Sequence, residues 1–120
     1  IPAMSATESG RRIHDFCWQT AVHGSFTEAL TLVGVGIERP LPSFFQLIAR
    51  TLQHRYGLTE AGTHYFAIHT VADVKHSQVA SRLVSESVHS PEDAARVRRV
   101  LFTLWDLQKQ QLDELLAAGS

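Results

Sequence analysis

The 120-residue chain contains one cysteine, Cys17, one methionine and no long apolar run. A single cysteine excludes an intrachain disulfide and any zinc site built from several thiolates, and it favours a reducing, cytoplasmic setting. The apolar runs are too short to span a membrane. Basic and acidic residues nearly balance, with a net charge of -1. The charge therefore gives no reason to expect binding to nucleic acid or to an anionic membrane.

The chain also lacks an initiator methionine at position 1, since it opens Ile-Pro-Ala-Met. The opening has neither the basic nor the apolar region of a signal peptide. We therefore expect a processed product or a piece of a longer chain.

No stretch alternates between apolar and polar residues with the period of a β-strand, whereas signals for helix starts and ends are frequent. The expected helices run from Ser5 to about His23, from Ser25 to Glu38, from Ser43 to Tyr56, from Thr59 to Glu86, and from Ser90 to about Ala117. Five helices with short connections predict an all-α helical bundle, with residues 1–120 forming a single domain.

The fourth expected helix carries the most informative pattern. His69, Asp73 and His76 are spaced i, i+4 and i+7, so they share one helical face. That face is otherwise largely apolar and includes Leu58, Tyr65, Phe66, Ala72, Val79, Ala80, Leu83 and Val84. A helix buries such a face against its neighbours, so we expect the two imidazoles and the carboxylate in the core.

Burying an unpaired carboxylate costs roughly 2 kcal/mol or more. The carboxylate of Asp73 therefore needs a partner. A metal ion satisfies this need, because it keeps the carboxylate ionised and the imidazoles neutral. The alternative is a hydrogen-bonded His-Asp-His cluster without metal.

Glu38 is the best candidate for a further ligand from another helix. It follows the apolar stretch Val33-Gly-Val-Gly-Ile37 and precedes Arg39-Pro40. Gly34 and Gly36 weaken a helix, or else they let a neighbouring helix or a ligand approach closely. The alternative for Glu38 is an ion pair with Arg39 or Arg50 at a solvated helix end.

Three segments between Gly36 and Glu86 together carry a family resemblance. They are Glu38-Arg-Pro40, the turn Tyr56-Gly-Leu-Thr59, and Phe66-x2-His69-x3-Asp73-x2-His76. The chain resembles the haem-oxygenase-like diiron oxidases and oxygenases, also described as iron-containing redox enzymes, whose fold is shared with thiaminase II and pyrroloquinoline-quinone synthase. The last helix, with Trp105 and its leucines, is similar to the closing helix of that family.

The resemblance implies a haem-oxygenase-like bundle and a non-haem diiron site with Glu38, His69, Asp73 and His76 as ligands. Two iron ions are expected, with manganese as an alternative. The reaction would use O2 on a small organic substrate such as an amino acid, an amine or a fatty acid. Tyr65 would lie just outside the ligands as a hydrogen-bond donor or radical relay, or would be an ordinary core tyrosine.

The family pattern also implies a Glu and a His about seven residues apart on an earlier helix, and this sequence has no such pair. We therefore expect an incomplete bundle, the C-terminal portion of a longer domain. The missing ligands would come from the rest of the domain or from a second chain, and the exposed apolar surface would favour a homodimer.

Two other functions remain open at this stage. A metal-free protein similar to the thiaminases or quinone synthases would bind a heterocycle and use His69 and His76 as acid–base or hydrogen-bonding groups. A non-enzymatic interaction domain would use the polar stripe to fix the register of its helices.

Overall fold

The computed structural model describes residues 7–119. Its elements are α1 (Glu8–His23), α2 (Phe26–Leu30), the π-helix η1 (Thr31–Ile37), α3 (Leu41–Tyr56), the 3₁₀ turn η2 (Ala61–Thr63), α4 (His64–Ser87) and α5 (Pro91–Ala118). The described chain is helical throughout apart from short connections, which confirms the predicted all-α fold.

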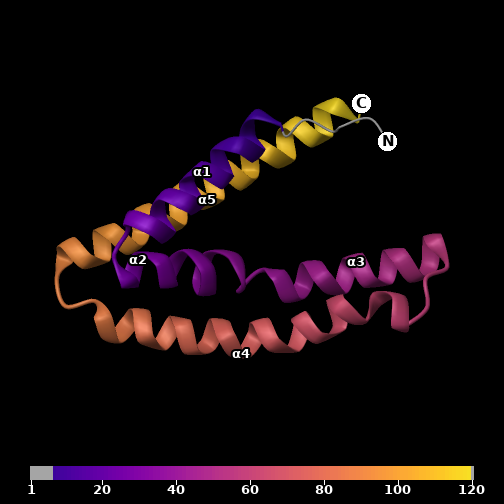
Figure 1. The fold of residues 1–120 in the computed structure, drawn as a ribbon, viewed down its shortest axis with the longest axis horizontal. Coiled ribbons are helices and arrows are strands. Elements are labelled where there is room, and N and C mark those ends of the chain that lie inside the picture. The colour runs from indigo at the N-terminus through magenta and orange to yellow at the C-terminus, as the bar shows by residue number, and fades with distance from the viewer. Residues whose placement is uncertain (1–6, 120) are drawn as a thin grey trace.

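The helices form two layers that diverge from one end (Figure 1). In one layer α1 packs along α5, and in the other α3 packs along α4. The segment formed by α2 and η1 lies between them and contacts both α4 and α5. The molecule is therefore elongated, with principal extents of 51 × 31 × 22 Å.

The core lies where η1 meets α5. Leu32, Val100 and Leu104 are buried there, and Phe16, Cys17 and Ile37 pack against them. Burial of these side chains connects the two layers, because η1 also packs on α4.

Several predicted helix boundaries are confirmed. The Ser25 hydroxyl accepts a hydrogen bond from the Glu28 amide while the Glu28 carboxylate accepts one from the Ser25 amide, so the predicted capping box is complete. Ser90 caps α5, with Pro91 at the first helical position. Gly57 ends α3 in the left-handed conformation, with φ of 68°.

Other boundaries differ from the prediction. Ser5 lies outside the described residues, and Thr7 caps α1. The third helix begins at Leu41 rather than at Ser43, because Pro42 is accommodated in the first turn, where an amide hydrogen is not needed. The Thr59 hydroxyl accepts a hydrogen bond from the Gly62 amide in η2, whereas α4 begins at His64.

The predicted buried faces are also partly wrong. In α4 the buried residues are Asp73, Ser77, Ala80 and Val84, so the buried face is centred near Asp73 rather than near His69. Tyr65 and Val79 on the predicted face are exposed. In α5, Leu112, Leu115 and Leu116 are exposed, since α1 contacts this second half of the helix through other residues, Ser9 with Glu114 and Arg12 with Gln110. Within residues 7–119, none of the helices combines the length and the hydrophobicity of a membrane-spanning segment.

Candidate metal centre

Glu38 owes its position to the π-helix that precedes it. The Glu38 amide donates a hydrogen bond to the Val33 carbonyl, five residues back, at 2.8 Å. The sequence predicted an α-helix through to Glu38, but the second half of that helix is wound as η1. Single π-helical turns are rare and are often found at functional sites. Here the turn ends directly at the carboxylate.

Two glycines let η1 lie close to its neighbours. A β-carbon on Gly34 would overlap the β-carbon of Ala80 in α4. A β-carbon on Gly36 would lie 2.6 Å from a methyl group of Leu104 in α5. The structure thus confirms one of the two interpretations of these glycines, the close approach of neighbouring helices. This approach brings Glu38 to α4.

Glu38, Asp73 and His76 come together at the contact between η1 and α4. One oxygen or nitrogen atom from each residue lies within 4.8 Å of the other two. The Nδ1 atom of His76 is 3.6 Å from Oε1 of Glu38. Asp73 is buried, Glu38 is partly buried, and the side chain of His76 is 62% exposed. The expected pairing of Glu38 with an acid and an imidazole of the fourth helix is therefore present in the geometry.

Asp73 provides the test of whether these residues suit a cation. Its residue exposure is 4%, and its Oδ2 atom is buried with no hydrogen-bond partner. Such an atom is costly to bury, unless a positive charge satisfies it. A metal-free, hydrogen-bonded His-Asp-His cluster would give Asp73 a partner from α4, and this oxygen has none. Two carboxylates and one imidazole are a donor set that suits iron(II) or manganese(II).

His69 does not belong to this group of three. Its Nδ1 atom lies 2.8 Å from the Tyr65 carbonyl, one turn back in α4. A carbonyl only accepts hydrogen bonds, so Nδ1 is the donor in this contact, and in the neutral imidazole Nε2 then carries the lone pair. This is the tautomer that a metal ligand needs, with the ring oriented by its second nitrogen. The imidazole ring packs against the Tyr65 ring at a centroid distance of 4.1 Å.

Tyr65 lies in an aromatic cluster at the contact of α3 with α4. The ring of Phe45 is 6.1 Å from that of Tyr65, 5.5 Å from that of Phe66 and 6.0 Å from that of His69. Tyr65 is 59% exposed, so it is not an ordinary core tyrosine, which was the alternative to a role beside the ligands. The cluster forms an apolar wall next to His69.

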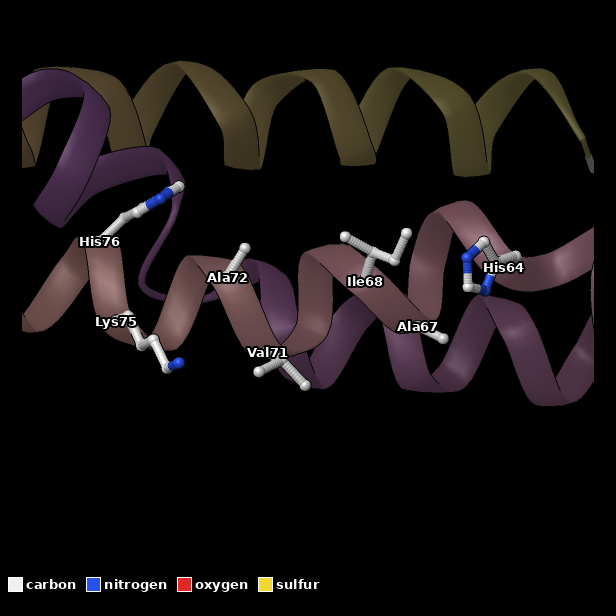
Figure 2. A pocket seen from close by; sticks show the side chains of 7 residues that line it. All are labelled: His64, Ala67, Ile68, Val71, Ala72, Lys75 and His76. Carbon is white, nitrogen blue, oxygen red and sulfur yellow. The ribbon is translucent and has the colours of Figure 1, made fainter.

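A shallow groove of about 610 Å³ runs along α4 beside His76. Figure 2 shows its lining side chains, with His64 at one end and His76 at the other. Ile68, Val71 and Ala72 make the middle of the groove apolar. This surface was not predicted from the sequence, because only one apolar face was assigned to the helix. The signal was available: Ile68, Val71 and Val74 do not fit that face.

The groups whose pKa is clearly shifted lie away from the candidate centre. Hydrogen bonds from Ser25 lower the pKa of Glu28, and hydrogen bonds from Ser90 and His89 lower the pKa of Asp93. Both carboxylates cap helices. Burial raises the pKa of the Cys17 thiol, which favours the protonated and unreactive form.

Comparison with known proteins gives one match. A family model described as iron-containing redox enzyme matches residues 3–109, which is most of the chain. No curated protein and no solved structure matches the chain.

Proposed function

Because the chain belongs to the family of iron-containing redox enzymes, we propose that it is a non-haem iron oxidase or oxygenase using O2 on a small organic substrate. Glu38, Asp73 and His76 are the proposed iron ligands. The observation that carries this proposal is the buried, unpartnered Oδ2 atom of Asp73 within a group of two carboxylates and an imidazole.

The three residues have distinct tasks in this proposal. Glu38 and Asp73 supply two negative charges that offset the charge of a divalent ion, and burial strengthens this attraction. His76 binds in its neutral form and leaves the total charge unchanged. Iron, when bound, supplies the electrons and open coordination positions that allow O2 to be reduced as the substrate is oxidised.

His69 is the proposed fourth ligand. It lies one turn before Asp73 on α4, and its hydrogen bond to the Tyr65 carbonyl leaves Nε2 with the lone pair. A change in the side-chain torsions of His69 would present Nε2 to the group, at the cost of this bond or of its ring contact with Tyr65. Phe45, Tyr65 and Phe66 then form the apolar wall against which an amino acid, an amine or a fatty acid would lie.

The resemblance implies two iron ions, and the group described above supplies ligands for one. Within residues 7–119, Glu38, Asp73 and His76 are the one group of three acidic, histidine or cysteine side chains close enough to hold a metal. A diiron centre would need further carboxylate and imidazole ligands from outside this part of the chain.

Iron content tests the proposal. Metal-free protein is reconstituted anaerobically with Fe(II), desalted and analysed for iron per chain, and O2 consumption is then recorded with candidate substrates. We expect at least one iron per chain in the wild type and loss of most of it in Asp73→Asn and His76→Ala. His54→Ala serves as the control, because His54 is an exposed histidine at the far end of α3. A wild-type protein that retains no iron after anaerobic reconstitution would refute the proposal.

A further inference from the structure

A second groove, of about 440 Å³, lies on the other side of Asp73 from His76. It is lined by Arg39 from the turn after η1 and by four side chains of α4, Val74, Ser77, Gln78 and Ser81. At about 100° per residue along α4, Ser77 lies about 40° to one side of Asp73, whereas His76 lies about 60° to the other. This hollow, which we call the Arg39 groove, is therefore distinct from the apolar groove beside His76.

Both walls of the Arg39 groove continue directly from the candidate metal centre. Arg39 follows Glu38 in the chain, and Ser77 lies one helical turn beyond Asp73. The turn between η1 and α3, which carries Arg39, lies beside the middle of α4 (Figure 1). A molecule in the groove would therefore lie next to a metal ion held by Glu38 and Asp73.

Arg39 carries the only charge among the side chains that line this groove. Within residues 7–119 its guanidinium makes neither an ion pair nor a hydrogen bond. Glu38, the acid next to it in the chain, lies against His76 instead. A guanidinium presents its N–H donors in a planar fork that matches the two oxygens of a carboxylate. The groove therefore offers one unused cation of the geometry that recognises a carboxylate.

The other lining residues are mostly polar and uncharged. The Ser77 hydroxyl donates a hydrogen bond to the Val74 carbonyl at 3.1 Å, so its lone pairs remain able to accept one. Gln78 and Ser81 add an amide and a hydroxyl to the same hollow. A volume of about 440 Å³ with a few converging polar groups is typical of a site for a small molecule.

We propose that Arg39 binds the carboxylate of the substrate in this groove, so that the substrate is a carboxylic acid rather than a simple amine. The inference rests on the proposed function, because it identifies the molecule on which the metal centre would act. The positive charge of Arg39 also offsets the negative charge that a carboxylate would bring next to Glu38 and Asp73. An amino acid and a fatty acid share this chemistry, and the binding experiment distinguishes them.

Binding is tested on metal-free protein, since the Arg39 groove does not need iron in order to hold a carboxylate. The standard amino acids and the straight-chain acids from butyrate to dodecanoate are screened by thermal shift. The strongest binder is then compared with its own amide by calorimetry. We expect the amide, which has the same shape but no negative charge, to bind at least 10-fold more weakly.

Substitutions of Arg39 test which residue binds the carboxylate. Arg39→Leu should weaken binding of the acid at least 10-fold. Arg39→Lys should retain part of the affinity, because lysine keeps the charge but not the planar fork. Arg50→Leu is the matched control, since Arg50 is an exposed arginine of α3 outside the groove.

Substitutions of the exposed Gln78 change the charge of the groove without removing a buried side chain. Gln78→Glu should weaken binding of the acid at least 10-fold, because the new carboxylate pairs with Arg39 and repels the ligand. Gln78→Lys should strengthen binding. Gln46→Glu, at an exposed position of α3 outside the groove, should leave the affinity unchanged.

Iron content and thermal stability separate the failure of this inference from the failure of the proposed function. Arg39→Leu should load as much iron as the wild type and melt at the same temperature. A wild type that loads iron but binds no acid of the screen, or binds acid and amide equally, would overturn the inference alone. So would an Arg39→Leu variant that melts earlier but binds the acid as tightly as the wild type, because Arg39 would then form a structural ion pair. A wild type that retains no iron, but whose acid binding depends on Arg39, would refute the proposed function alone.

Discussion

Gly34 of η1 lies against Ala80 of α4 so closely that a β-carbon on Gly34 would overlap the β-carbon of Ala80. Replacing a helical glycine by alanine ordinarily stabilises a protein by about 0.5–1 kcal/mol. Here the sign should reverse, and Gly34→Ala should lower the free energy of unfolding by about 1–3 kcal/mol, since the helices must move apart. Denaturant unfolding measures the change.

The same substitution should weaken Fe(II) binding, because it moves η1 and therefore Glu38 away from α4. Gly62→Ala is the control, since a β-carbon on Gly62 would lie 3.6 Å from its nearest neighbour, an ordinary contact. Equal effects of the two substitutions on stability and on iron affinity would show that close packing at Gly34 does not position the carboxylate.

Asp73→Asn should have opposite effects on the metal-free and the iron-loaded protein. Without iron the variant should be more stable than the wild type by about 1–3 kcal/mol, because a neutral amide is less costly to bury than a carboxylate with an unpartnered oxygen. With excess Fe(II) the melting temperature of the wild type should rise, and that of the variant should not. Asp106→Asn on the exposed side of α5 is the control. A metal-free variant that is less stable than the wild type would show that Asp73 has a partner of another kind.

His69→Ala and His76→Ala should differ in their effect on iron affinity. His76 already lies with Glu38 and Asp73, so its removal should lower Fe(II) affinity by about 100-fold or more. The loss of His69, which must turn toward the group, should lower the affinity by about 10-fold. Competition with a chromogenic chelator measures both values, with His54→Ala as reference. An unchanged affinity in His69→Ala would remove His69 from the ligand set.

The contribution of the Glu28 cap of α2 to the free energy of unfolding should depend on pH. Hydrogen bonds from Ser25 lower the pKa of Glu28 in the folded protein below its ordinary value of about 4.3. A lowered folded-state pKa stabilises the protein above the unfolded value, and this contribution is lost as the pH falls through the folded value. The difference in unfolding free energy between wild type and Glu28→Gln should therefore be constant near pH 7 and shrink below about pH 4.3. A difference that grows on acidification would contradict the capping role.

Leu104→Ala should cost far more stability than Leu112→Ala, although both leucines lie on α5. Leu104 is fully buried against η1, so its truncation should lower the unfolding free energy by about 2–5 kcal/mol. Leu112 is 58% exposed, and its truncation should cost less than about 1 kcal/mol. Comparable losses would indicate that the second half of α5 is covered in solution.

The sequence predicted most of the helices, because their starts and ends are local. Hydrogen bonds and backbone torsions within a few residues determine these ends, at Ser25 with Glu28, at Ser90 with Pro91, and at Gly57. The start of α3 was misplaced because proline is compatible with the first turn of a helix as well as with its interruption.

The sequence predicted only part of the candidate centre, because the position of Glu38 depends on contacts between residues that are distant in the sequence. The spacing of Asp73 and His76 is a property of one helix, but the position of Glu38 depends on the π-helical turn and on two contacts between helices. The sequence marks these contacts only by Gly34 and Gly36, which are equally compatible with a weak α-helix. His69 and Tyr65 were expected on the buried face, but η1 packs on Ala80, and the buried face of α4 is centred near Asp73.

No side chain of α3 is buried, although the helix spans sixteen residues. Protection of backbone amides against hydrogen exchange follows the free energy of local opening, which is low where little apolar surface is buried. Amides of α3 should therefore exchange with solvent sooner than those near Leu104, where η1, α1 and α5 meet. Thermal unfolding of the isolated chain would accordingly begin at the far tip of the α3–α4 hairpin and advance toward the junction that holds Glu38.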